Sequence, residues 1–175
     1  MALSTAEAIR DRNLDIIEAV DPVSLTSTRF RRYRNEGKGD FRTVMESQPA
    51  ASLRRFQARN IGNDEPPAVS NMSFEERRLS LEIVIAYPQD HHAGPANALD
   101  RDDMIEQDWV EIDTNIGITG RGNFGSTYDC TPIGCTKEIE RGEVCDFLVI
   151  RAEFIYQRAL SIGGLVSELG AGLGG

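Results

Sequence analysis

The stretch that decides the fold is LSLEIVIAY, residues 79–87. Its alternate residues are Leu79, Leu81, Ile83, Ile85 and Tyr87, with Ser80, Glu82, Val84 and Ala86 between them. Successive side chains of a strand point to opposite faces, so this pattern predicts a long strand with one buried face. The half-polar second face is typical of an antiparallel sheet, and Pro88 ends the strand.

A second stretch, FLVIRAEFIY at residues 147–156, alternates in the same way. We expect it to pair with residues 79–87 at the centre of a sheet. Shorter strands are predicted at residues 26–35 (TSTRFRRYRN) and 53–59 (LRRFQAR), both of which interleave aromatic and basic side chains.

Two amphipathic helices complete the predicted core. Ser4 and Glu7 have capping-box spacing, and Asp21-Pro22 ends the first helix. Its apolar stripe consists of Ile9, Ile16, Ile17 and Val20. The second helix, of about 15–20 residues, follows the long strand and ends at Gly117. Its stripe consists of Ile105, Trp109, Ile112 and Ile116, and its acidic start of Asp100, Asp102 and Asp103.

The connecting segments differ in character. Residues 36–51 are rich in turn formers and residues 60–73 form a long polar loop. We expect residues 117–142 to form a β-rich arm. The glycine-rich residues 161–175 are expected to form a flexible tail that orders only on assembly. The sequence therefore predicts one α+β domain over residues 1–160, with a mainly antiparallel sheet packed against two helices.

Composition narrows the class of protein. The 175 residues are 40% hydrophobic and 27% charged, with three cysteines, and we expect no signal peptide or membrane span. An odd cysteine count fits a reducing compartment. Residues 1–78 carry 13 Lys and Arg against 12 Asp and Glu, whereas residues 79–175 carry 6 against 16. This uneven distribution of charge along the chain favours electrostatic contact between neighbouring copies, unless the two sets of charges mix on the folded surface.

The arginines of the first predicted strand are candidate contact residues. Basic residues among aromatics also occur in nucleic-acid-binding proteins, but the net charge of −9 and the absence of a recognised motif argue against that use. We expect a partner interface, the alternative being a solvated face. The candidates are Arg29, Arg31, Arg32 and Arg34 of this strand, with Arg121 and Phe124 of the arm.

Three patterns resemble chemical motifs. Residues 120–125 match G-x-G-x-x-G, but a helix precedes them and no predicted helix follows, which disfavours a dinucleotide loop. Asp90, His91 and His92 follow a strand, as in metal-dependent phosphoesterases, yet no second metal motif accompanies them. Cys130, Cys135 and Cys145, with His91 or His92, could form a Cys₃His zinc site; their x4 spacing allows it, whereas the x9 spacing is wider than usual. We therefore expect no enzyme, metal or cofactor, and keep a small metal-dependent hydrolase as the alternative.

The order of elements resembles the tail-terminator and tail-completion proteins of tailed phages. The similarity rests on the residues RFQA at 55–58, IVIAYP at 83–88, the Asp-rich helix with Asp103, Asp108 and Ile112, and the strand ending at Tyr156. It covers residues 5–160. The 60–73 loop, the 117–142 arm and the glycine-rich tail depart from the simplest members, which leaves open whether this chain is the terminator or another neck protein.

The resemblance implies a structural protein of the virion, assembled in the host cytoplasm. Members form a ring, usually hexameric, that caps the tail tube and meets the head connector. DNA passes through such a ring without sequence-specific contact, and no membrane is involved. A heterologous contact closes into a ring when its rotation allows, so the uneven charge distribution fits this expectation.

Overall fold

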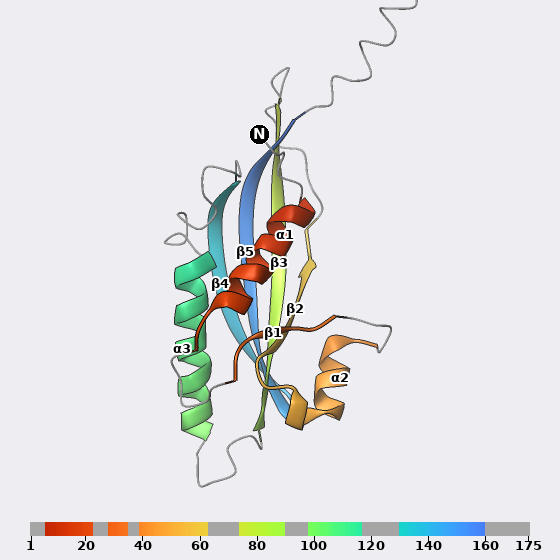
Figure 1. Ribbon diagram of the computed structural model, residues 1–175, viewed down its shortest axis with the longest axis vertical. Helices are drawn as coiled ribbons and strands as arrows, with labels where there is room; N and C mark the ends of the chain where they lie inside the picture. The colour runs from red at the N-terminus through yellow and green to blue at the C-terminus, as the bar shows by residue number, and fades with distance from the viewer. Residues whose placement is uncertain are drawn as a thin grey trace, which may run out of the picture.

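The two alternating stretches form the central strands of the sheet, as the sequence predicts. In the computed structural model, β3 (Phe74–Pro88) pairs antiparallel with β5 (Cys145–Ala159) in one unbroken register, with Leu79 opposite Phe154. The structure describes residues 6–22, 28–34, 39–62, 74–89, 98–116 and 130–159. Both long strands run the length of the molecule in Figure 1.

Three further strands flank this pair to give a mixed sheet of order β1-β2-β3-β5-β4. On one side lie β2 (Arg55–Asn60), antiparallel to β3, and the two-residue β1 (Arg31–Arg32), parallel to β2. On the other side β4 (Cys130–Arg141) runs antiparallel to β5. The α+β class and the largely antiparallel pairing are confirmed.

Two helices cover one face of the sheet. They are α1 (Ala6–Ala19) and α3 (Ala98–Ile116), and Figure 1 shows α1 crossing in front of the strands with α3 beside β4. Ile9 and Ile17 of α1 and Ile105 and Ile112 of α3 are buried against the predicted inner face of β3. Burying each such side chain contributes roughly 1.5–3 kcal/mol, so both predicted stripes are confirmed where described.

A third helix, α2 (Phe41–Ser47), covers one end of the opposite face. Its Phe41, Val44 and Met45 pack in a separate cluster with Val84 and Phe147. Only turns are predicted at residues 36–51, because the two turns of this seven-residue helix carry too short an apolar pattern. Asp40 caps it by accepting bonds from the backbone N–H groups of residues 42 and 43, at 3.1 and 3.3 Å.

The predicted strand at residues 26–35 is much shorter in the structure. Only Arg31–Arg32 pairs as a strand within the described residues 28–34. Phe30 is buried in the core under α1 and α3, whereas Tyr33 packs against the cluster around α2. The strand is thus limited to the two residues that pair with Arg55 and Phe56 of β2.

The predicted β-rich arm at residues 117–142 is not confirmed as an arm, although its described second part is β-structure. Residues 130–141 form β4, whose register with β5 shifts between Pro132 and Gly134. This irregularity breaks the period-2 pattern and so hid the strand. The first part of the arm, with Arg121 and Phe124, and the predicted tail at 161–175 lie outside the described residues, as does Ser4 of the predicted capping box.

Candidate functional site

The predicted contact arginines have different roles once folded. Arg29 pairs with Asp21 at 2.7 Å. Arg32 pairs with Asp15 of α1 at 2.6 Å, and its backbone N–H donates to Glu18 at 3.0 Å. Arg32 therefore attaches the segment to α1, and Arg29 attaches it to the residues that follow this helix.

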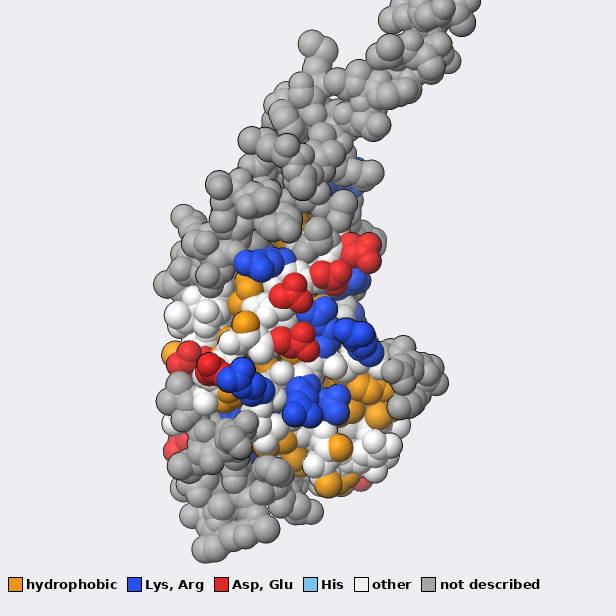
Figure 2. All heavy atoms as spheres, viewed as in Figure 1, with side chains coloured by type: hydrophobic (Ala, Val, Ile, Leu, Met, Phe, Trp, Pro, Cys, Tyr) orange, Lys and Arg blue, Asp and Glu red, His pale blue; other side chains and the backbone are white. Residues whose placement is uncertain are grey.

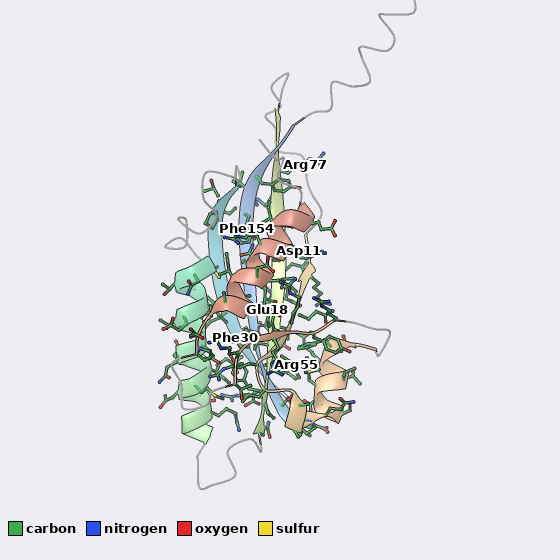
Figure 3. The ribbon with its side chains drawn as sticks, viewed as in Figure 1. Asp11, Glu18, Phe30, Arg55, Arg77 and Phe154 are labelled. Atoms are coloured by element: carbon green, nitrogen blue, oxygen red, sulfur yellow. The ribbon has the colours of Figure 1, made fainter. Side chains whose placement is uncertain are left out.

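Arg31 and Arg34 are exposed, and neither has an acidic partner within the described part of the chain. A third arginine, Arg55, joins them from β2, where it lies opposite Arg31 in the strand register. Figure 3 labels Arg55 close to the crossing of β1, and Figure 2 shows basic side chains gathered over this part of the surface. The resemblance included Arg55, but only the strand register shows that it lies beside Arg31.

Arg34 and Arg55 border a pocket of about 290 Å³ between β1 and α2. Its wall combines apolar side chains from α2 with arginine side chains from the neighbouring segments. The lining consists of Arg32, Tyr33, Arg34, Val44, Met45, Gln48, Ala51 and Arg55. We call it the arginine pocket.

Two hydrogen-bond donors in the wall of the arginine pocket are buried and unsatisfied. The Tyr33 hydroxyl and the Arg32 Nε have no hydrogen-bond partner among the residues that the structure describes. A buried donor without an acceptor costs about 1–3 kcal/mol. The pocket therefore favours a ligand that brings acceptor oxygens and negative charge.

A buried network anchors the segment that carries the pocket. Arg54, whose φ of 53° is unusual for a non-glycine residue, donates to the Thr28 carbonyl at 2.8 Å and lies over the Phe30 ring at 5.6 Å. Its backbone carbonyl accepts from the Arg31 N–H at 3.0 Å. Arg54 thus holds both sides of residue 30 in place.

Arg54 is itself held by α3. Its guanidinium donates twice to Asp108, at 2.6 and 3.0 Å, and the Tyr87 hydroxyl donates to the same carboxylate at 2.9 Å. Burial raises the pKa of Asp108, against these hydrogen bonds, which lower it. Burial, followed by the charge of Asp108, raises the pKa of Tyr87 well above its usual value. The network has a structural role and cannot contact a ligand, because the side chains of Arg54 and Asp108 are fully buried.

The opposite side of the molecule carries the complementary charge. Residues 28–34 and β2 together hold six arginines and no acidic residue, and three of them (Arg29, Arg32 and Arg59) pair with acids of other segments. The helix α3 holds seven acidic residues and one arginine. Asp102 pairs with Arg141, and Glu106 with Lys137. Asp103, Glu111 and Asp113 have no cationic partner in the described part of the chain. Figure 1 shows α3 and the β1–α2 region on opposite sides of the sheet.

The cysteines considered for zinc binding do not come together where the structure describes their side chains. Cys135 packs in the core under α1 and α3, whereas Cys145 lies in the cluster around α2, so the two thiols are on opposite faces of the sheet. Burial raises the pKa of both, that of Cys135 to about 12. The remaining candidates lie outside the described residues. They are Asp90, His91 and His92, the G-x-G-x-x-G stretch at residues 120–125 and the Cys130 side chain. Across the described ranges, no three His, Cys, Asp or Glu residues are grouped to hold a metal ion.

No protein-family model matches the chain. No curated protein matches it either. Among the described helices, none has the length and apolar character needed to cross a membrane.

Proposed function

We propose that this protein is a non-enzymatic assembly subunit that forms a ring and serves as a tail terminator of a tailed phage. In that role it caps the tail tube and joins it to the head connector, in a virion assembled in the host cytoplasm. The observation that carries the proposal is the separation of charge between the two sides of the sheet. A surface that attracts the opposite side of the next copy generates head-to-tail contacts, which close when the rotation permits.

The sheet edges support the same proposal. Among the described strands, β4 has a neighbour only on its β5 side, although it is 12 residues long. A strand with one unpaired edge is a ready contact for another chain. Repeated contacts of this kind need no catalytic centre. The resemblance to tail-terminator proteins adds the hexamer, the tail tube and the head connector as the proposed partners.

The proposal is tested by tube capping. Purified protein is added to a polymerising tail tube protein from the same genome, and tube length is followed by electron microscopy. Shorter tubes with a ring at one end are expected, because a cap blocks further addition. Tubes of unchanged length that never carry the protein would contradict a terminator. Binding to the head connector alone would instead favour another neck protein.

The hydrolase alternative predicts a different result in the same preparation. Residues Asp90, His91 and His92 supply the ligand types for zinc or manganese. Elemental analysis of the purified protein would then give one or two metal ions per chain, and their removal would abolish phosphoesterase activity. Ring formation in metal-free buffer, with no stoichiometric metal, is the outcome expected for the assembly subunit.

A further inference from the structure

We propose that the arginine pocket receives an acidic side chain from the outer face of α3 in a second copy of this chain. This inference rests on the proposed self-assembly and identifies the two surfaces that meet. It starts from the pocket, whose unsatisfied donors Tyr33 Oη and Arg32 Nε lie beside the arginines Arg34 and Arg55. A carboxylate supplies acceptor oxygens and negative charge to Arg34 and Arg55, which have no acidic partner among the described residues.

The apolar part of the pocket selects the kind of anion. Val44, Met45 and Ala51 form part of its lining, so a bare phosphate would leave this part of the wall uncovered. A carboxylate on an aliphatic side chain, with an apolar neighbour, matches both the basic and the apolar parts of the pocket lining. Nucleic acid is disfavoured because the chain has a net charge of −9, which repels a polyanion at long range.

The outer face of α3 carries that combination. Residues 103, 106, 107, 110 and 111 have the spacing of one helical stripe, and the first four are exposed. Asp103 and Glu111 have no cationic partner within the described residues, and Val110 between them is 53% exposed. The stripe thus offers free carboxylates around an exposed apolar side chain.

The positions of the two surfaces allow a head-to-tail contact. The arginine pocket lies beside β1 and α2, and α3 lies at the β4 side of the sheet (Figure 1). Because the surfaces differ and face different sides, each copy can use both at once. Every contact leaves one pocket and one α3 face for the next copy, as a ring requires.

A charge-swap experiment tests the pairing. One variant reverses the pocket (Arg34→Glu/Arg55→Glu) and the other reverses the helix (Asp103→Arg/Glu111→Arg). We expect each alone to weaken self-association about a hundredfold in sedimentation velocity, because like charges then face each other. Mixing the two variants should restore assembly, since each provides the partner that the other needs. The control is Arg78→Glu, which changes an exposed arginine of β3 that is not part of the pocket.

A smaller change tests the unsatisfied hydroxyl. Tyr33→Phe keeps the ring, which packs on Phe41 at 5.4 Å, and removes only the donor. It should weaken association about threefold to tenfold. If wild-type protein assembles but neither reversal weakens it, or mixing restores nothing, the pairing is wrong while the assembly function stands. If the wild-type chain stays monomeric, the proposed function itself fails and this inference fails with it.

Discussion

Arg54 and Asp108 form a bidentate ion pair across 54 residues of sequence, with both side chains fully buried. Arg54 comes directly before β2, and Asp108 lies near the middle of α3. The pair therefore joins the segment that carries the arginine pocket to the helix that carries the complementary acidic face. Tyr87 at the end of β3 completes the connection.

Removing the charge of Asp108 should strongly destabilise the fold. Asp108→Asn leaves the Arg54 guanidinium buried without a counter-charge, which costs about 3–5 kcal/mol. The free energy of unfolding from urea titration measures the effect. The control is Glu153→Gln, a change at an exposed carboxylate of β5 that should stay within about 0.5 kcal/mol. Equal effects of the two variants would show that the buried pair does not hold the fold together.

Stability should fall in alkaline solution through Tyr87. Its pKa in the folded chain lies above the value of 10.0 for a free phenol, so its contribution is full below pH 10 and is lost as pH rises above it. Tyr87→Phe costs about 1 kcal/mol at neutral pH but should flatten this decline. Urea unfolding at a series of pH values up to 11 measures both effects. A parallel shift of the whole curve, with the same alkaline slope, would contradict the assignment.

Cys135 and Cys145 should react slowly with thiol reagents. Burial is the main cause that raises both pKa values, and that of Cys135 reaches about 12, so almost no thiolate is present at pH 8. Alkylation by iodoacetamide, followed by mass spectrometry in a Cys130→Ser background, should modify both residues only after denaturation. Because the pKa of Cys135 is raised, ionisation of this thiol also lowers the stability of the fold between pH 9 and pH 12. Rapid alkylation of the native protein would show that these thiols are accessible.

Two glycines of the β4–β5 hairpin should respond differently to the same substitution. A Cβ at Gly142 would collide with Glu46 Oε1 and the Cys145 carbonyl, whereas a Cβ at Gly134 meets nothing within 4 Å. Glu46 also accepts a bond from the Val144 N–H at 2.9 Å, so the collision disturbs the contact between α2 and the hairpin. Gly142→Ala should cost about 1–3 kcal/mol, and Gly134→Ala should be neutral or slightly stabilising. Thermal unfolding of both variants checks this, and a similar loss in each would refute the steric explanation.

The central fold could be predicted because its hydrophobic patterns are local in sequence and extend over many residues. The alternation at residues 79–87 and 147–156, and the stripes of α1 and α3, repeat often enough to define both the element type and its buried face. Short or irregular elements lacked that repetition. The helix α2 has only seven residues, and the bulge of β4 at Pro132 and Gly134 interrupts its pattern.

The candidate site was predictable only in part. Its arginine-rich segment stands out in the sequence, but which arginines remain free depends on acids of α1 that are distant in sequence, such as Asp15 for Arg32. Arg55 joins the surface through the pairing of β1 with β2. The buried partner of Arg54 is likewise set by how α3 packs on the sheet, which residue spacing does not encode.

Native mass spectrometry of the wild-type chain in metal-free buffer tests the central claim most directly. A ring-forming subunit predicts one closed oligomer of a single size, with no bound metal and with assembly lost in the Arg34→Glu/Arg55→Glu variant. A chain that remains monomeric at every concentration tested, or that carries stoichiometric zinc or manganese, would contradict the account.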